Sequence, residues 1–221
     1  MTQTLKRPFL LGSLDINKVL QDLSDFSATS FRILTEDFRM SLLAEAQGYP
    51  YSPEAEIVGC GGRIVRQQVG SFEGFPDHSQ FILLQNSFQA LLNRCIAHSG
   101  TSAFQTPLSL TSLVLQKYAK GSLGITPHRD HLRYINLICI FVIGGRGRFY
   151  VCSDRSGRDS KEIDASPGHV ILLKAPGFIG SRDRPFHYVT DIQETRYTFA
   201  LRQEQQMIRE DMPGSDSQTH R

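Results

Sequence analysis

The chain has 221 residues and a mass of 24.9 kDa, and its 24 basic and 22 acidic side chains leave a formal net charge of +2. This length suits one well-packed domain with appended helices, and so small a net charge neither demands nor excludes a polyanionic partner, because nucleic-acid binding depends on where the charge lies. No apolar run approaches the ~20 residues of a membrane span, so no membrane insertion is expected.

The first hundred residues are predicted to be mainly helical, with one extended interruption. Asp15 and Thr35 are suitable N-caps for two helices whose apolar residues recur at helical spacing, and Gly48 is expected just past the end of the second. Residues 80–98 show the clearest helical periodicity. Between these helices, residues 57–69 combine Ile and Val with several glycines, which predicts a strand or hairpin near a sheet edge.

After Gly100 the chain breaks into short segments rich in Val, Ile, Leu, Phe and Tyr, separated by Gly, Pro, Ser and Asp. Strands are predicted at residues 110–118, 134–143, 147–153, 169–174, 186–190 and 196–202. Gly144 and Gly145 favour a hairpin between the second and third of them. Many short strands without intervening helices predict an antiparallel sandwich or jelly roll, with the early helices packed against its outside.

We therefore expect a mainly β protein with flanking N-terminal helices, of the α+β class. Residues 1–106 are expected to supply the helices and the strand and lid elements that pack on the core. Residues 107–203 are expected to form the β core, so that the whole is one domain. Residues 204–221 are polar, and a segment with so little apolar surface is predicted to be disordered.

The four cysteines are scattered along the sequence and form no CxxC pair. This spacing indicates neither a disulfide framework nor a zinc knuckle. The apolar patch near the N-terminus is too short for the core of a signal peptide. Reduced thiols in a cytoplasmic protein are therefore expected, and the protein is expected to be a monomer without a membrane partner.

A candidate metal site begins with His128 and Asp130, which flank a single residue. In an extended strand, residues two apart point to the same face, so this imidazole and carboxylate can bind one ion, although such a pair also occurs as an ordinary surface pair. His187 lies on another predicted strand and can be brought across by a sheet that folds back on itself. Two histidines and one carboxylate leave positions open on an octahedral ion, as in non-haem Fe(II) oxygenases.

Other constellations are weaker. A zinc site would combine His128, His131, Cys139 and Cys152, but Cys139 stands in an apolar run and is expected in the core. A hydrolase triad would combine Ser181, Asp183 and His187, but it lacks the context of a nucleophile elbow. His169 is expected to be solvated or hydrogen-bonded.

The last predicted strand, residues 196–202, has two distinct faces. Arg196, Thr198, Ala200 and Arg202 share one face, and the large apolar residues between them share the other, which should pack between sheet and helices. The arginine face belongs either to a solvent-facing edge strand or to a concave interior that binds an anion. The two arginine α-carbons would lie about 20 Å apart at ~3.3 Å per residue, but their long side chains can converge on a dicarboxylate. With a metal nearby, this arrangement suggests 2-oxoglutarate.

These residues occur in a characteristic order: Tyr118-x-x-Gly121, His128-x-Asp130, His187, then Arg196 and Arg202. Because of this order and spacing, the chain resembles the AlkB family of Fe(II)/2-oxoglutarate-dependent dioxygenases. The resemblance covers roughly residues 110–203. The resemblance implies a double-stranded β-helix, or jelly roll, with residues 107–203 as the catalytic core. It also implies His128, Asp130 and His187 as iron ligands and as the catalytic centre.

The resemblance further implies that Arg196 and Arg202 bind the carboxylates of 2-oxoglutarate. Tyr118 and Gln116 would add hydrogen bonds to this co-substrate, Gln116 standing where the family often has asparagine. The implied reaction uses O2 to oxidise a C–H bond of the substrate and releases succinate and CO2.

Three hypotheses about the function remain open, two of which concern the substrate. The first is oxidative N-dealkylation of nucleic acid, for which Arg63 and Arg66 in the lid region, with Arg182 and Arg184, would supply a basic rim. The second is hydroxylation of a small metabolite or a protein side chain, because His131-Leu132-Arg133 follows the ligand pair where family members acting on alkylated bases often carry acidic residues. The third is a jelly-roll binding module without turnover.

Overall fold

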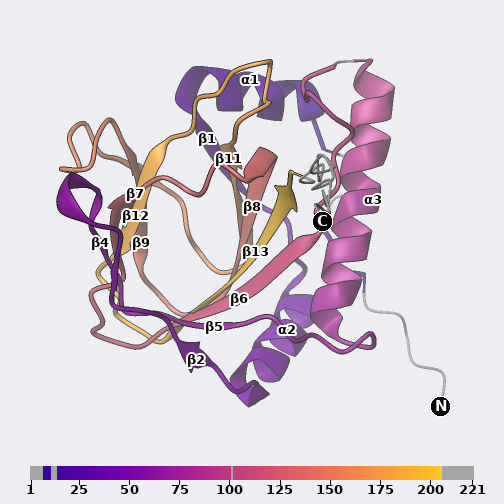
Figure 1. The fold of residues 1–221 in the computed structure, drawn as a ribbon. Helices are drawn as coiled ribbons and strands as arrows, with labels where there is room; N and C mark the ends of the chain where they lie inside the picture. Colours follow the sequence, from indigo (N-terminus) through magenta and orange to yellow (C-terminus); the bar gives the residue numbers. More distant parts are fainter. Residues whose placement is uncertain (1–6, 11–13, 101, 206–221) are drawn as a thin grey trace, which may run out of the picture.

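The computed structural model describes residues 7–10, 14–100 and 102–205 (Figure 1). Its helices are α1 (Ile16–Phe26), α2 (Glu36–Gly48) and α3 (Gln80–Ser99). The early strands are β1 (Ala28–Arg32), β2 (Ser52–Pro53), β3 (Ile57–Val58), β4 (Val65–Arg66) and β5 (Gly70–Phe72). The later strands are β6 (Ser112–Tyr118), β7 (Ile125–His128), β8 (Tyr134–Gly144), β9 (Arg148–Cys152), β10 (Lys161–Ile163), β11 (His169–Lys174), β12 (Phe186–Thr190) and β13 (Arg196–Glu204).

Two antiparallel sheets face each other, as Figure 1 shows. The larger sheet has seven strands in the order β1-β11-β8-β13-β6-β5-β2, and the smaller has four in the order β10-β9-β12-β7. The three helices lie against the outer face of the larger sheet, away from the smaller one. A separate hairpin, β3–β4, stands beside the smaller sheet at the end of the sandwich. The predicted sandwich with helices on its outside is therefore confirmed.

Strand β13 separates two hydrophobic cores, because its side chains alternate between the two faces of the larger sheet. Tyr197, Phe199 and Leu201 pack against the helices in the first core. Ala200 faces the second core, which lies between the two sheets. The predicted division of this strand into an apolar, helix-facing side and an arginine side is confirmed. Of the two environments left open for the arginine side, the structure shows the interior one.

Aromatic contacts fix the longest helix on the sheet. Ser79 caps α3 by accepting a hydrogen bond from the backbone N–H of Phe81 at 3.0 Å. Within α3, Phe81 contacts Phe199 of β13 with ring centroids 4.8 Å apart, and Phe88 meets Phe141 of β8 edge to face at 4.9 Å. Such pairs stabilise a core beyond their buried area. None of the described helices is long and apolar enough to cross a membrane.

The predicted helix ends need two corrections. Asp15 caps α1 as expected, accepting from the backbone N–H of Lys18. Thr35 is the N-cap of α2, but its hydroxyl donates to the carbonyl of Arg7 instead of accepting from the helix. Gly48 is the last residue of α2 and does not lie beyond it. The segment that precedes the helix thus competes for the Thr35 side chain.

All six predicted strands are present, but five short ones were not predicted. These are β1, β2, β5, β7 and β10, of two to five residues each, and β2 lies where regular structure was expected to break. Their composition is polar or contains proline or glycine, so their pairing comes from neighbouring strands and not from local propensity. The predicted strand or hairpin at residues 57–69 is the β3–β4 hairpin. Glu204, the first residue of the predicted disordered tail, is instead the last residue of β13, and residues 206–221 lie outside the described residues.

Gly124 is required at the start of β7. Its φ is +79°, and a Cβ atom there would collide with the carbonyl oxygen of Val189 on β12. We expect Gly124→Ala to destabilise the protein by roughly 2–4 kcal/mol, because it adds left-handed backbone strain to a collision with main chain. Gly48→Ala, where nothing lies within 4 Å of the new methyl group, should leave stability unchanged or slightly raised. Urea unfolding measures both, and equal midpoints for the two variants would contradict the expectation.

Candidate metal centre and co-substrate pocket

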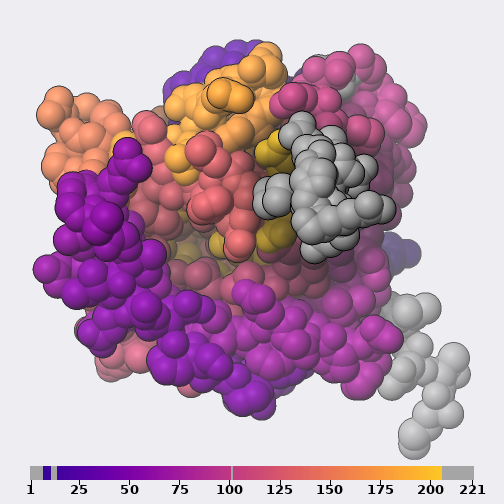
Figure 2. All heavy atoms as spheres, in the orientation of Figure 1, coloured from indigo at the N-terminus to yellow at the C-terminus, as the bar shows by residue number. Residues whose placement is uncertain are grey.

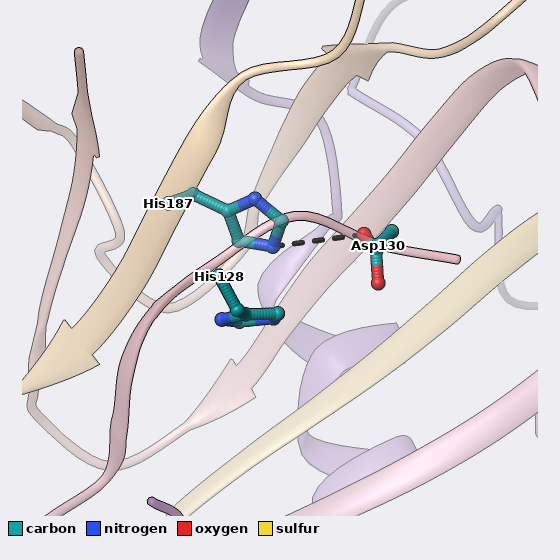
Figure 3. Close-up of side chains that lie close together, drawn as sticks. All are labelled: His128, Asp130 and His187. Carbon is teal, nitrogen blue, oxygen red and sulfur yellow. Dashed lines mark ion pairs between the residues drawn. The ribbon is translucent and has the colours of Figure 1, made fainter. Parts of the chain in front are cut away.

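The fold brings the three predicted metal ligands together between the two sheets (Figure 3). His128 is the last residue of β7, His187 lies on the adjacent strand β12, and the two are directly paired in the register. Asp130 follows just beyond the end of β7, not within the strand as predicted. One ligand atom from each of the three residues lies within 4.8 Å of the others. The rings of the two histidines are 4.4 Å apart, and His187 Nε2 is 3.6 Å from Asp130 Oδ2.

Backbone carbonyls set the tautomer of both histidines. His128 Nδ1 lies 3.0 Å from the carbonyl oxygen of Thr126, and His187 Nδ1 lies 3.3 Å from that of Pro185. Because a carbonyl only accepts, each Nδ1 carries the hydrogen and each Nε2 keeps a free lone pair. A backbone carbonyl behind the ring is the usual way in which proteins orient a metal-ligating histidine. Phe149 of β9 stacks against the His187 ring at 5.6 Å and restricts its rotation.

The electrostatic environment keeps the three groups in the form that binds a cation. Burial lowers the pKa of His187, and burial together with the charge of His187 lowers the pKa of His128 to about 4. Burial alone would raise the pKa of the Asp130 carboxyl, but the charges of Arg202 and the two histidines outweigh it and lower that pKa. Near neutral pH the centre therefore consists of two neutral imidazoles and one carboxylate. A metal site needs its ligands in this deprotonated form.

The centre opens into a cavity of about 690 Å³. Figure 2 shows this hollow between the purple segment that carries β2 to β5 and the pink-red segment that follows β7, with yellow atoms of β13 at its floor. The volume suits a small co-substrate together with part of a second molecule. The cavity is lined by all seven residues that the sequence predicts for the site: Gln116, Tyr118, His128, Asp130, His187, Arg196 and Arg202.

Arg196 is the deepest cation in this cavity. Its side chain is only 1% exposed, and its Nε and Nη2 atoms have no hydrogen-bond partner among the described residues. Burial lowers its pKa to about 10, so the guanidinium stays charged at neutral pH. Burying a charge without a counter-ion costs free energy. An anionic ligand that pairs with the Arg196 guanidinium would offset this cost.

Arg202 lies at the other end of the strand, on the metal side of the cavity. Its charge is the largest influence that lowers the pKa of Asp130, and its Nε is also buried without a partner among the described residues. The Tyr134 ring contacts both Arg202 and Arg133, with its centroid 4.9 and 4.8 Å from the two guanidinium carbons. Tyr134 therefore holds Arg202 toward the metal centre.

Strand β6 lines the cavity beside β13. The register pairs Arg196 with Tyr118 and Thr198 with Gln116, so hydroxyl and amide groups stand beside the deeper arginine. Tyr118 Oη lies 3.4 Å from Gln116 Oε1, and burial raises the pKa of the Tyr118 phenol, which therefore remains a hydrogen-bond donor. Two cationic ends linked by neutral donors fit a small dicarboxylate.

The donor set also fits the metal that the sequence suggests. Two imidazole nitrogens from paired strands and one carboxylate oxygen from the segment just after β7, with one side open to a cavity, match the facial triad of non-haem iron sites. A dicarboxylate bound by the two arginines would lie within reach of an ion held by these three ligands.

The alternative sites are not assembled. Among the described residues, the cluster that could hold a metal contains neither His131 nor a cysteine, and Cys139 is fully buried, as predicted. Asp183 pairs with Lys174 at 2.9 Å, so it is not the partner of a catalytic histidine. His169 bonds the carbonyl of Ser166 and faces Asp164, as expected of a hydrogen-bonded residue.

Sequence reasoning missed Phe149 and Tyr134 as residues of the site, and it assigned Arg184 only to a basic rim. Arg184 donates a hydrogen bond to the backbone carbonyl of Asp130 and so supports the loop that carries this ligand. Phe149 and Tyr134 orient His187 and Arg202, but each stood in the sequence as one apolar residue of a predicted strand. Only their contacts across the sandwich show that Phe149 and Tyr134 belong to the site, because neither residue is part of a spaced sequence motif.

Comparison with solved structures identifies proteins of similar fold. A prolyl hydroxylase from Trichoplax adhaerens, solved with a peptide fragment of the hypoxia inducible factor oxygen degradation domain, has a TM-score of 0.62 and 15% identity over 84% of this chain and 87% of that one. A 2OG-Fe(II) oxygenase family oxidoreductase from Burkholderia pseudomallei has a TM-score of 0.60 and 14% identity, covering 87% and 92%. The protein OsALKBH1 has a TM-score of 0.53 and 14% identity, covering 80% and 98%. No protein-family model and no curated protein sequence matches the chain.

The chain has the double-stranded β-helix fold of these oxygenases. The predicted fold class is thereby confirmed. The similar structures include both a prolyl hydroxylase and OsALKBH1, so the likeness extends across the 2-oxoglutarate oxygenase fold and is not confined to AlkB proteins. At these identities the likeness establishes the fold, and the chemistry rests on the side chains described above.

We expect the metal-free protein to lose stability as the pH falls from about 6.5 toward about 4. The pKa of His128 is about 4 in the folded protein, against 6.5 as its ordinary value. Between these values the unfolded chain binds a proton that the folded chain does not, so acidification favours unfolding, by roughly 1–3 kcal/mol in total. Urea unfolding across this range measures the slope, which His128→Gln should flatten. A variant with the slope of the wild type would show that other groups cause the dependence.

Proposed function

We propose that this protein is an Fe(II)- and 2-oxoglutarate-dependent dioxygenase that oxidises a C–H bond of its substrate. One observation carries the proposal: the His128–Asp130–His187 cluster shares a cavity with Arg196, a buried guanidinium that lacks a counter-ion among the described residues. The metal centre and the anion site are thus parts of one cavity. The fold, which is that of the 2-oxoglutarate oxygenases, is consistent with this chemistry.

The position of each residue in the cavity determines the role that we propose for it. His128, Asp130 and His187 would hold the iron, and Arg196 would hold the far carboxylate of 2-oxoglutarate, because Arg202 lies nearer the metal ligands. Tyr118 and Gln116 would donate hydrogen bonds to the co-substrate between these ends. Iron(II) with 2-oxoglutarate and O2 supplies the oxidising power, one oxygen atom going to succinate, formed with CO2, and the other to the substrate. The protein positions the reactants and excludes water.

The proposal is tested by aerobic incubation with Fe(II) and 2-oxoglutarate. Even without the primary substrate, enzymes of this chemistry are expected to form succinate slowly, because the co-substrate can react alone. Succinate formation that needs both iron and O2 would support a dioxygenase. Tight 2-oxoglutarate binding without any succinate would instead indicate a jelly-roll binding module.

For the primary substrate, we propose an AlkB-like reaction, oxidative N-dealkylation of a nucleic acid. Arg63 and Arg66 on the β3–β4 hairpin are exposed next to strands that line the cavity, where they can meet phosphates. Salt-sensitive binding of single-stranded oligonucleotides, weakened by Arg63→Glu, would support this substrate. Failure of every methylated oligonucleotide to raise succinate output would favour the alternative, hydroxylation of a small metabolite or a protein side chain.

A further inference from the structure

A second pair of arginines stands at the mouth of the cavity, apart from the pair on β13. In the sequence, Arg129 stands between the ligand residues His128 and Asp130, just after β7, and Arg184 lies just before β12. Arg129 is exposed, and its guanidinium carbon stacks over the Phe186 ring at 4.2 Å. Arg184 is half-buried and donates one N–H to the carbonyl of Asp130. Both guanidinium groups are therefore fixed by contacts that use only part of their donors.

No carboxylate in the described part of the chain forms an ion pair with either arginine. The nearby Asp183 is paired with Lys174 at 2.9 Å, and the carboxylate of Asp130 faces His187. Both arginines line the same cavity and the same groove, and like charges that share a site without an ion-pair partner repel each other. Such an arrangement is relieved by an anion that bridges both groups.

Arg129 and Arg184 also line a second groove, of about 330 Å³, besides the main cavity. This groove continues past Phe186 to Lys161, which stacks over Phe26 at 4.1 Å. The two arginines thus stand where the main cavity and the groove adjoin. A molecule that enters the cavity and extends into the groove must pass them.

The geometry points to an oxyanion subsite for the primary substrate at Arg129 and Arg184, and we propose that the substrate carries a phosphate group there; this inference rests on the proposed function. The pair offers two charges and several N–H donors in planar forks. A phosphate presents oxygens in several directions and carries up to two negative charges, so one group can satisfy both arginines. A carboxylate can accept from both groups, but its single charge balances only one of the two guanidinium charges.

The subsite is tested in the metal-free protein, so that its result is independent of turnover. Inorganic phosphate is titrated while the Nε–Hε signals of the arginine side chains are followed by NMR. We expect saturable shifts of the Arg129 and Arg184 signals, and an increase in the dissociation constant of roughly tenfold or more in Arg129→Gln, since a charge-assisted hydrogen-bonding group is lost. Arg146→Gln is the matched control, because Arg146 is exposed in the turn after β8 and pairs with Glu194 at 3.0 Å.

Three further probes define the ligand chemistry. Glycerol 2-phosphate represents a phosphomonoester, and dimethyl phosphate represents the phosphodiester of a nucleic-acid backbone. The probe with the lower dissociation constant identifies which kind of phosphate the substrate carries. Acetate that binds as tightly as phosphate would overturn the assignment of phosphate. Shifts that do not saturate, or that persist unchanged in Arg129→Gln, would overturn the subsite itself. Neither result would affect the iron-dependent formation of succinate, which tests the function separately.

Discussion

His187→Ala is expected to reduce iron-dependent succinate formation by more than ~100-fold. His187 supplies one of three candidate ligands and is 4% exposed, so no solvent-borne group replaces it easily. Changes to residues that only orient a ligand already cost roughly 10–100-fold in metal affinity or activity, and loss of the ligand itself should cost more. Binding of Co(II) as a spectroscopic substitute should weaken in parallel, which gives a readout independent of turnover.

The control is His98→Ala, which removes an exposed imidazole from the last turn of α3 without touching the cavity. It should retain succinate formation and Co(II) binding. His187→Gln, which keeps more of the buried volume, guards against a variant that merely fails to fold. A folded His187→Ala protein with wild-type succinate formation would show that the metal centre lies elsewhere.

Arg196→Met is expected to change two properties in opposite directions. It should weaken 2-oxoglutarate binding by roughly 30-fold or more, because truncating one member of a buried charge pair costs about 2–5 kcal/mol. In the absence of ligand, the free energy of unfolding should stay equal or rise, since Arg196 is buried without partners for two of its nitrogens. Replacing such a charge by an apolar side chain of similar length is often neutral or stabilising by roughly 1–4 kcal/mol.

The measurements are the KM for 2-oxoglutarate and the urea midpoint of the ligand-free protein. If Arg196 had a purely structural role, its replacement would lower the urea midpoint, because the ligand-free fold would be destabilised. Arg146→Met is the matched control, and its exposed ion pair with Glu194 should contribute little to either property. An unchanged KM in Arg196→Met would remove this residue from the co-substrate site.

The local features of the fold were predictable because they depend on residues close together in the chain. Alternation along residues 196–202 placed Phe199 on the side that packs in a core and Arg196 on the opposite side, and the structure puts that opposite side in the interior. The periodicity of residues 80–98 predicted α3 to within one residue at its end. Side-chain period and cap chemistry are local properties, so the sequence states them directly.

The short strands were not predictable in the same way. Strand β1, Ala-Thr-Ser-Phe-Arg, has little strand propensity of its own, yet it pairs along its whole length with β11. Its conformation comes from the hydrogen bonds offered by that edge. Strand β7 carries His128, but it contains Pro127 and ends at the ligand.

For the site, the sequence by itself determined the kinds of side chain and their order: two histidines, one carboxylate and two arginines. Only the tertiary structure decided that His187 pairs opposite His128, because strand register depends on contacts between distant segments. It also decided that Arg196 is buried without a counter-ion among the described residues and that Arg129 and Arg184 line the same cavity. Burial and charge balance belong to the assembled sandwich, since each side chain receives its neighbours from strands far away in the sequence.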